Sequence, residues 1–458
     1  MNARKMAGLV AVAAMLLAAG AAQAAITIDT VPVGNPGNAA DTHGAGYGAV
    51  SYTYDIGKYE VTAGQYTAFL NAVGGVDTYS LYNTDMNYDA FPDYHGCNIK
   101  RTASSGSYAY SVDPNWANRP VNWVSWGNAA RFANWLHNGQ PSGAQGLATT
   151  EDGAYYLNGA TSEEALLAVS READWKWAIT SEDEWWKAAY YKGGSTNAGY
   201  WDYPTRTNSL PGRDMTEATN PGNNANYCTT SYLIGSPYYR TEVGEFQLSD
   251  SPYGTFDQGG NVWEWVEDAH GSYRGLRGGS FNSYDFCMLA SPWYSKPGNG
   301  EPGVGFRVSE LRHPGDANGD GAVDVGDLGI LGENYGQSGM DWAHGDFNGD
   351  GSVDVGDLGI LGANYGWPAG GGAATVPEPA TLSLLALGGL AMIRRRRRKR
   401  GQEPLSGSGI APGIDTAPRR PAKGKQWKRF LIPFPPDPFS SPQHRPRGAH
   451  GHGGAGDR

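Results

Sequence analysis

Two stretches of twelve residues with the same pattern of Asp, Asn and Gly constrain the fold of this chain most. Residues 316–327 read DANGDGAVDVGD and residues 346–357 read DFNGDGSVDVGD, so the same pattern occurs twice in tandem. Each stretch places side-chain oxygens at positions 1, 3, 5, 9 and 12 and a glycine at position 6. Calcium takes roughly six to eight oxygen ligands, and glycine at position 6 lets the chain turn sharply around the ion. The pattern therefore predicts two neighbouring calcium-binding loops.

The predicted ligands occupy equivalent positions in the two loops, with glycine (Gly321 and Gly351) at each sharp turn. Five side chains and the backbone carbonyl at position 7 would surround each ion. In the first loop the ligands are Asp316, Asn318, Asp320, Asp324, Asp327 and the carbonyl of Ala322. In the second loop they are Asp346, Asn348, Asp350, Asp354, Asp357 and the carbonyl of Ser352.

Position 12 carries Asp in both loops, whereas ordinary EF-hand loops carry Glu there. Together with the Leu-Gly-Ile-Leu segments that follow the loops, this makes residues 314–366 similar to a type I dockerin. The resemblance implies a small all-α domain that folds on calcium and docks into a cohesin-like domain, often in polysaccharide-degrading complexes. The usual Ser-Thr recognition pair at positions 10 and 11 is replaced by Val325-Gly326 and Val355-Gly356. A calcium-stiffened spacer is therefore the alternative interpretation.

The N-terminus has the pattern of a secretory signal peptide over residues 1–24. Arg4 and Lys5 form a charged start, Met6 to Leu17 is a short apolar run, and Ala22-Gln23-Ala24 is an A-x-A cleavage site. A first membrane helix fits less well, because the run is short and ends in small residues. We therefore expect the chain to be exported.

Residues 376–400 combine a Pro-Glu-Pro motif, a short apolar segment and a basic cluster. The apolar segment, Ala380 to Ile393, has 14 residues, against about 20 for a helix that spans a bilayer comfortably. Basic residues follow at once, as on the cytoplasmic side of membrane helices. The segment resembles a PEP-CTERM sorting signal, which implies recognition by an exosortase-type enzyme, cleavage near Pro377-Glu378-Pro379 and sorting to the cell surface. A plain membrane anchor through the short helix is the alternative.

The remaining C-terminal segments are a Gly-rich linker, residues 367–375, and a tail rich in Pro, Gly and Arg, residues 401–458, which we expect to be disordered. Without the signal peptide and residues 394–458, the chain has 17 basic and 42 acidic residues, a net charge near −25. Such a charge disfavours nucleic acid as a partner and suits a calcium-rich exterior.

The main domain, residues 25–313, is rich in Gly, Trp and Tyr and has few long periodic runs, so short strands and ordered loops are expected. Three helices are predicted: one after a T-x-x-Q capping box at Thr62, one over residues 129–136, and one after Ser181 with Glu184 at the third position. Gly193-Gly194 is expected to end the third helix.

Cysteine is scarce, with only Cys97, Cys228 and Cys287 in the whole chain. In an exported protein, one pair could form a disulfide and leave an odd thiol. No CxxC pattern supports a zinc site.

Two segments of the main domain carry the strongest chemical signal: FDQGGNVWEW, residues 256–265, and RGLRGGSFNS, residues 274–283. The first holds the carboxylates Asp257 and Glu264 around a Gly-Gly-Asn turn. Hard cations prefer carboxylates mixed with backbone carbonyls, which a glycine-rich turn can supply at close range. The segment therefore suggests a calcium site.

These two segments and the blocks YDIGKYEVTAGQYTAFLN, RPVNWVSWGNAARFANWL, TSEDEWWKAAYY and GFRV resemble the formylglycine-generating enzyme family, in the family's order. The resemblance implies a mixed α/β, loop-rich fold related to C-type lectins. It also implies a calcium site made by the side chains of Asp257 and Glu264 and the carbonyls of Gly260 and Val262. The family's other calcium site does not map convincingly, with Asn226 as its one weak candidate.

The resemblance also raises the question of catalysis. The family oxidises a substrate cysteine with O2 and a copper(I) ion held by two cysteine thiolates, five residues apart after the GGS motif. Here Ser283 takes the first cysteine position, and Cys287 falls one residue short of the second. A hydroxyl cannot replace a thiolate for Cu(I), because it is hard and stays protonated. Nothing in the sequence brings Cys97 or Cys228 to Cys287, so we do not expect copper.

The sequence therefore predicts an exported calcium-binding protein whose main domain serves as a binding or display module. No HxxxH motif for an iron-dependent relative, and no Ser-His-Asp or phosphate-loop pattern, stands out. One alternative is an oxidase of the formylglycine type, or a divergent metal-dependent one, with Cys287 as its catalytic residue. Another is an accessory component of a polysaccharide-degrading complex, recruited through the dockerin-like repeats.

Overall fold

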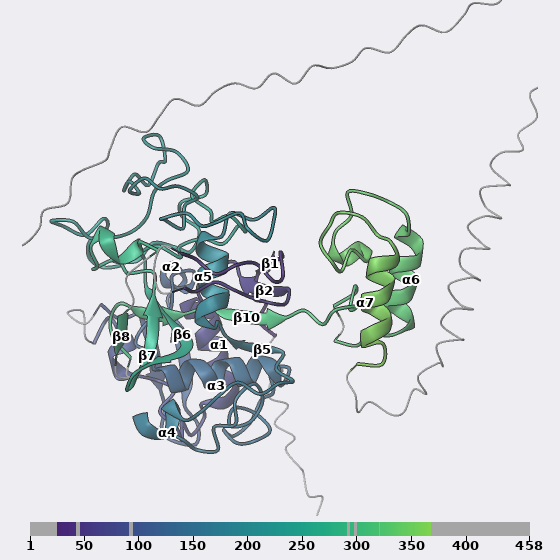
Figure 1. Ribbon diagram of the computed structural model, residues 1–458. Coiled ribbons are helices and arrows are strands. Elements are labelled where there is room, and N and C mark those ends of the chain that lie inside the picture. Colours follow the sequence, from purple (N-terminus) through teal and green to yellow (C-terminus); the bar gives the residue numbers. More distant parts are fainter. Residues whose placement is uncertain are drawn as a thin grey trace, which may run out of the picture. The chain divides into compact units, whose positions relative to one another are not determined.

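The computed structural model of the protein describes residues 25–42, 46–90, 95–290, 294–296, 300–319 and 321–367 (Figure 1). The predicted signal peptide, the PEP-CTERM segment, the C-terminal tail, most of the Gly-rich linker and the predicted ligand Asp320 lie outside these residues. Within the described part of the chain, no helix is long and apolar enough to cross a membrane.

The described residues of the main domain form two four-stranded sheets and a two-stranded hairpin. The first sheet has the order β1-β2-β10-β5 with antiparallel neighbours, and the second has the order β8-β7-β6-β9, in which β6 and β9 run parallel. The hairpin pairs β3 with β4. The strands are β1 (Thr30–Val33), β2 (Tyr54–Gly57), β3 (Ile99–Thr102), β4 (Ala109–Val112), β5 (Trp177–Ile179), β6 (Trp263–His270), β7 (Tyr273–Arg277), β8 (Tyr294–Lys296), β9 (Val304–Phe306) and β10 (Val308–Leu311).

Short helices and long connections complete the main domain, which confirms the mixed α/β, loop-rich prediction (Figure 1). The described helices are α1 (Ala63–Val73), α2 (Pro114–Ala117), α3 (Trp126–His137), α4 (Glu163–Leu167) and α5 (Glu182–Tyr190), with the 3-10 turns η1 (Thr84–Met86) and η3 (Asp285–Met288).

Local capping signals set the starts of the helices. Thr62 and Gln65 form the predicted capping box of α1, and Ser181 and Glu184 form that of α5. The prediction that Gly193-Gly194 ends the third helix is wrong, because α5 already ends at Tyr190. The next residue is extended and bridges to Tyr200, so the chain leaves the helix before it reaches the glycines.

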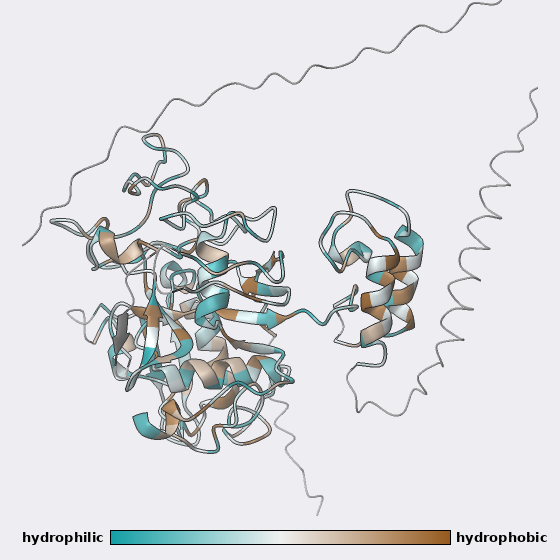
Figure 2. Ribbon diagram, in the orientation of Figure 1, coloured by the Kyte–Doolittle hydropathy of each residue, from teal (hydrophilic) through white to brown (hydrophobic). Residues whose placement is uncertain are grey.

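Aromatic rings pack together in the core of the main domain. α1 and α3 pack Tyr66, Phe69 and Phe132 against Phe306 of β9, with ring centroids between 5.3 and 6.5 Å apart. All four rings are fully buried. Figure 2 shows apolar residues along the strands and helices of this core. The packing fixes β9, and with it the segment that leads into β10.

The repeat segment contains α6 (Val325–Asn334), η4 (Trp342–His344) and α7 (Val355–Asn364). Its core repeats as the sequence does: Leu331 and Leu361 are buried at equivalent helix positions, and Val323 and Val353 are buried just before the helices. Figure 2 shows brown residues along both helices.

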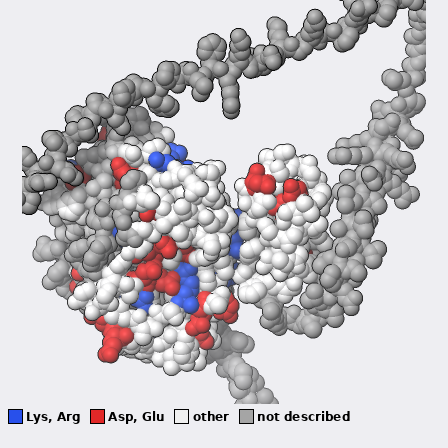
Figure 3. Space-filling model, in the orientation of Figure 1, with Lys and Arg blue, Asp and Glu red and all other residues white. Residues whose placement is uncertain are grey.

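Charged side chains of both signs lie close together on the surface. On the face drawn in Figure 3, Lys and Arg of the main domain lie beside Asp and Glu rather than in one basic patch. On the repeat segment, the same figure shows acidic groups gathered at one end.

Candidate functional site

Glu264 and Arg307 form a buried ion pair beside the predicted calcium site. Glu264 lies on β6 and Arg307 follows β9, and the parallel pairing of these strands sets Glu264 opposite Gly305. Arg307 donates from Nε to Glu264 Oε2 at 2.5 Å and from Nη2 to Oε1 at 2.7 Å. Trp185 Nε1 donates to Oε2 at 2.7 Å. Neither charged side chain is exposed to solvent, so removing one partner would leave an uncompensated buried charge.

The same guanidinium ties distant segments of the chain together. Arg307 Nη1 donates to the carbonyl of Gly57 at 2.8 Å, and Nη2 donates to the carbonyl of Phe256 at 2.9 Å. The end of β2, the loop before the Gly-Gly turn and β6 therefore meet at one side chain.

Two further carboxyl groups, those of Glu60 and Asp257, belong to this cluster. Burial raises the pKa of Asp257 to about 6, although the N–H of Gly244 donates to its Oδ2 at 2.6 Å and Arg307 also lowers it. Burial and the negative charge of Asp257 raise the pKa of Glu60 well above its usual range. Glu264 acts on both groups in the same direction. Three carboxyl groups thus share one guanidinium in a dry environment.

The cluster leaves buried oxygens without a hydrogen-bond partner. Glu60 Oε1 accepts from Asn261 Nδ2 at 3.2 Å, but Glu60 Oε2 is buried and has no hydrogen-bond partner among the described residues. The side-chain oxygen of Asn226 is also buried without a hydrogen-bond partner among the described residues. An unsatisfied buried oxygen is costly unless a proton or a cation compensates it. If the three carboxylates ionise, one guanidinium leaves two negative charges, which a divalent cation would balance. Protonation, which the raised pKa values of Glu60 and Asp257 favour, would balance the same charge.

The predicted ligands of the main domain lie on one turn that leads into β6. Gly260 has φ +89°, and a Cβ there would overlap the Asn226 carbonyl oxygen, so only glycine fits. Asn261 N donates to the same carbonyl at 2.8 Å. Asn226, the weak candidate for a second site, thus lies against the turn that also carries Val262. In the described residues, no three His, Cys, Asp or Glu side chains converge on a metal position, so calcium at this turn stays a prediction.

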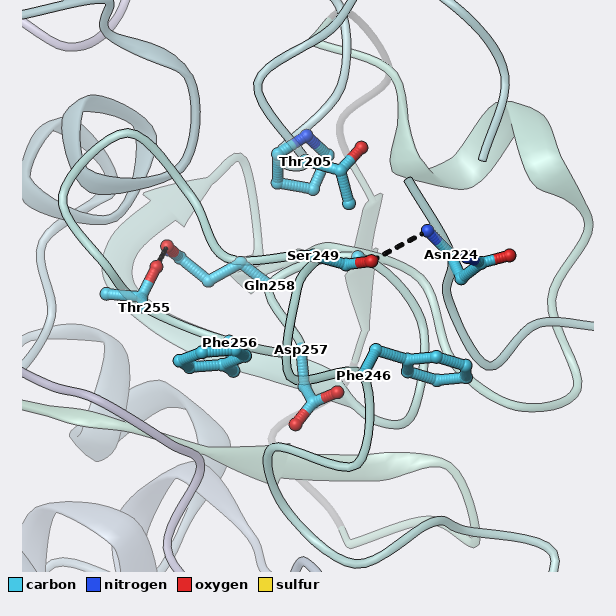
Figure 4. A pocket seen from close by; sticks show the side chains of 10 residues that line it. Thr205, Asn224, Phe246, Ser249, Thr255, Phe256, Asp257 and Gln258 are labelled. Atoms are coloured by element: carbon cyan, nitrogen blue, oxygen red, sulfur yellow. Dashed lines mark hydrogen bonds between the residues drawn. The ribbon is translucent and has the colours of Figure 1, made fainter. Parts of the chain in front are cut away.

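Asp257 also lines a small pocket, shown in Figure 4. Its wall there includes the rings of Phe246 and Phe256, which explains the strong effect of burial on this carboxyl group. The space measures ≈ 10 Å³, about enough for one water molecule. An organic ligand does not fit in this pocket.

The Gly278-Gly279 turn places the residues that correspond to the family's copper ligands. Ser283 Oγ lies 2.9 Å from Ser280 Oγ, and its N–H donates to the Ser280 carbonyl at 2.9 Å. Cys287 lies on η3, and a Cβ on Gly279 would come within 3.0 Å of its Cβ. Burial raises the pKa of the Cys287 thiol, while the Ser283 hydroxyl acts in the opposite direction. The thiol is therefore less ready to ionise and bind a metal than a free cysteine.

Sequence reasoning misses the position of Cys228. Its N–H donates to the carbonyl of Ser283 at 2.8 Å, so the backbone of a second cysteine lies beside the residue at the first copper-ligand position, while its Sγ contacts the Thr229 carbonyl. Cys228 lines an open pocket of ≈ 680 Å³ together with Tyr232, Asn282 and Tyr284, among others. Cys97 is fully buried in the hydrophobic core. All three cysteines are free thiols in the structure.

The two repeat loops have the same internal hydrogen bonds. At position 1, Asp316 accepts from the N–H groups of Gly319 and Gly321 at 2.7 and 2.9 Å. Asp346 accepts from the equivalent glycines of the second loop at 2.9 and 2.7 Å. Gly321 and Gly351, at position 6, have φ +83° and +84°, as the predicted sharp turn requires.

Position 12 closes each loop in the same way. Asp327 accepts from the N–H groups of Ala317 and Asn318, and Asp357 accepts from those of the equivalent residues, at 2.8 to 3.2 Å. Both side chains are fully buried. The capping boxes of α6 and α7 involve Asp324 with Asp327 and Asp354 with Asp357. Ala322 and Ser352, whose carbonyls are the predicted ligands at position 7, directly follow the turns. Asn348 Nδ2 donates to Asp350 Oδ2 at 3.1 Å.

A family model described as a sulfatase-modifying factor enzyme 1-like domain matches residues 26–310. A second model, of the PEP-CTERM protein-sorting motif, matches residues 375–398. No curated protein sequence gives a significant match.

Several solved structures are similar to parts of this chain. CarF shares 20% identity over 62% of this chain and 99% of its own, with a TM-score of 0.39. The Treponema denticola variable protein 1 shares 20% identity over 63% of this chain and 98% of its own, also with a TM-score of 0.39. PvdO from Pseudomonas aeruginosa shares 17% identity over 62% of this chain and 92% of its own, with a TM-score of 0.33.

Proposed function

We propose that this chain, which belongs to the family of the sulfatase-modifying factor enzyme 1-like domain, is a calcium-binding surface protein. Its main domain binds a ligand and does not oxidise cysteine. The PEP-CTERM motif indicates export and surface sorting and implies recognition by an exosortase-type enzyme. The secretory pattern of residues 1–24 supports the same route.

The observation that carries the loss of oxidase chemistry is the hydroxyl of Ser283. It occupies the first copper-ligand position and lies 2.9 Å from another hydroxyl, that of Ser280. Copper(I) prefers soft sulfur ligands, and a serine hydroxyl is neither soft nor ionised at neutral pH. The raised pKa of the Cys287 thiol weakens the remaining ligand further.

Calcium in the main domain is supported by the unbalanced carboxyl cluster. Asp257, Glu264 and the carbonyls of Gly260 and Val262 would hold the ion, and the buried Glu60 Oε2, which has no hydrogen-bond partner among the described residues, would add negative charge. When bound, the ion would neutralise the buried charge that Arg307 alone leaves. Its role would be to stabilise the fold rather than to catalyse a reaction.

The test combines metal analysis, thermal unfolding and a peptide assay on the purified protein. We expect bound calcium, no copper, and no conversion of a cysteine-containing sulfatase peptide to formylglycine. Calcium at about a hundredfold its Kd should add about 3 kcal/mol of stability over chelator. Glu60→Gln should reduce this calcium-dependent gain, whereas the exposed control Glu172→Gln should not. Copper-dependent peptide turnover would overturn the proposal.

A formylglycine-type oxidase is the second candidate, and the hydrogen bond between Cys228 N and the Ser283 carbonyl favours it. The arrangement brings the backbone of another cysteine to the residue that takes the place of the first copper ligand. If this candidate is correct, the protein binds copper, and Cys228→Ser and Cys287→Ser each abolish turnover. A protein that binds no copper under reducing conditions would exclude it.

A dockerin-type role is the third candidate. It is supported by two exposed valines, Val325 and Val355, which are 70% and 71% exposed at equivalent loop positions. Capture by a cohesin domain that is lost with chelator, and lost again when both valines are replaced by Glu, would establish it. If chelator and the two valine replacements leave the amount of protein captured by the cohesin unchanged, the repeat segment acts as a spacer.

A further inference from the structure

A wide cleft on the main domain shares no lining residue with the pockets beside Asp257 and Cys228. It measures ≈ 890 Å³, near the upper end of the range of about 300–1,000 Å³ for small-ligand pockets. Its walls come from residues 76–84, from the β3–β4 hairpin and from the N-terminal turn of α3. None of the proposed metal or thiol chemistry uses it.

Each charged side chain among the described lining residues is already paired. Arg101 Nη1 contacts Asp77 Oδ2 at 3.1 Å, and both line the cleft. Arg131 donates to both carboxylate oxygens of Glu151 at 2.7 and 2.9 Å. A strongly charged ligand would therefore find no unpaired counter-charge there, and the cleft suits a neutral one.

Tyrosine rings stack on these paired guanidinium groups. Arg101 lies 4.8 Å from the ring centroid of Tyr82 and 4.3 Å from that of Tyr108. Arg131 lies 4.4 Å from the ring centroid of Tyr79. Tyr79 and Tyr108 are only partly buried, so part of each ring remains accessible. Because the rings are held in place, a ligand that stacks on them would lose little binding energy to side-chain ordering.

The rest of the wall is mainly hydroxyl and amide groups. Among the described lining residues, only Val76 and Leu166 have aliphatic side chains, which is too little apolar surface for a peptide groove. Ser80, Asn83 and Asn128 place polar groups around the rings. Fixed rings with hydroxyl and amide groups around them match a sugar, whose C–H face stacks while its hydroxyls form hydrogen bonds.

The backbone of the cleft is held in rarely used conformations. Asp77, Ser80 and Trp123 have φ values of +60°, +54° and +60°. Each such residue costs on the order of 1–3 kcal/mol, and such strain clusters at ligand sites. For a bulky residue such as tryptophan, this conformation is uncommon.

We propose that this cleft binds a neutral oligosaccharide, with Tyr79 and Tyr108 as stacking platforms and the Asp77–Arg101 pair as a hydrogen-bonding group. The inference rests on the proposed function, a binding module, and names its ligand class and its site. Affinity for a neutral sugar should change little between low and high salt, because no ion pair with the ligand forms.

The test is calorimetric titration of the full protein with cello-, xylo- and chito-oligosaccharides, with a uronic acid oligosaccharide as the charged comparison. We expect at least one neutral series to bind and Tyr108→Ala to weaken it about tenfold or more. Tyr108→Phe should restore most of the affinity, because the ring remains. The matched control is Tyr284→Ala, an exposed tyrosine at the pocket of Cys228, which should leave binding unchanged.

The outcomes separate this inference from the proposed function. Neutral sugar binding that survives Tyr108→Ala and is lost in Tyr284→Ala would keep the binding module and overturn this cleft. Binding of only the charged oligosaccharide, or of none, would overturn the ligand class. An unchanged melting temperature for each variant shows that the folded state is being compared.

Discussion

At the residue scale, the domain depends on single side chains that compensate buried charge. Sequence reasoning finds Glu264 and Asp257, because both lie in one short turn. It misses Glu60 and Arg307, although they lie in the segments KYEVT and GFRV that carry the family resemblance. The pairing of β6 with β9 sets Arg307 close to Glu264, and the hydrogen bond from Val61 N to the Phe306 carbonyl brings Glu60 to the same region, so no local spacing indicates either residue. Cys228 is missed for the same reason, since a backbone hydrogen bond between two distant segments of the chain places it beside Ser283.

Glu310 should make the stability of the main domain depend on pH. It lies opposite Asp55 in the β2–β10 pairing, and burial together with that negative charge raises its pKa to about 7. A raised pKa means that the folded state binds the proton more tightly than the unfolded state. Stability is therefore lost as the pH rises from about 4.5 to 7. We expect Glu310→Gln to be more stable than wild type by about 1–2 kcal/mol at pH 8, with little difference at pH 4.5.

Thermal unfolding at the two pH values measures this effect. The exposed Glu172→Gln serves as the control and should shift neither curve. A Glu310→Gln variant that is no more stable at pH 8 would show that Arg312, which pairs with Asp55, already compensates both carboxylates.

Gly260 should be the least replaceable glycine of the predicted calcium turn. Gly260→Ala combines a positive φ with an overlap with the Asn226 carbonyl oxygen, a backbone atom that cannot move aside cheaply. We expect a loss of about 3 kcal/mol or more in the free energy of unfolding. Gly271→Ala, with φ +64° and nothing within 4 Å, isolates the conformational cost and should lose about 1 kcal/mol. Equal losses in denaturant titrations would contradict the steric argument.

At the scale of elements, local sequence signals predict the first residue of a helix better than its last residue. The capping boxes of α1 and α5 need only residues three apart, so the sequence alone identifies them. The end of α5 depends on a bridge between Tyr191 and Tyr200, which competes with helix continuation before the glycines are reached. Sheet order depends on pairings such as that of β2 with β10, two strands from opposite ends of the main domain's sequence. No periodicity within either strand specifies such a partner.

The repeat helices make a matched pair for mutation. Leu331 and Leu361 are 2% and 0% exposed at equivalent positions of α6 and α7. Leu331→Ala and Leu361→Ala should therefore lose similar amounts of stability, about 2–4 kcal/mol each. Val325→Ala, at a 70% exposed position, should stay within about 0.5 kcal/mol of wild type. Calcium-saturated unfolding followed by circular dichroism compares the three variants, and a clear difference between the leucines would show that the repeats are not equivalent.

At the scale of the whole molecule, the chain combines a sorting motif with a main domain and a repeat segment. The family and the sorting motif were predictable, because ordered sequence blocks carry them, and both are confirmed. The metal and the partner are not fixed by sequence or fold. The metal depends on which oxygens and thiols the folded chain brings together at one point, and the partner depends on which side chains line the exposed surfaces.

Sorting through the PEP-CTERM segment predicts a shortened product. If an exosortase-type enzyme cleaves near Pro377-Glu378-Pro379, peptides from residues 401–458 should be absent from the surface protein and present only in its precursor. Mass spectrometry of surface and membrane fractions measures this. Replacement of the three residues by alanine should retain the C-terminal peptides, and finding those peptides in the wild-type surface protein would argue against cleavage.

The position of β10 has a consequence for the order of assembly. This strand is one of the last elements of the main domain in sequence, yet it lies between β2 and β5 in the first sheet. Arg307, just before it, joins the end of β2 to Phe256 and Glu264. If the chain is exported through a translocon from its N-terminus, β2 and β5 emerge before β10, the strand that joins them. The domain can therefore close only after Leu311, the last residue of β10, has left the channel, and until then a holding chaperone would find the edges of β2 and β5 open.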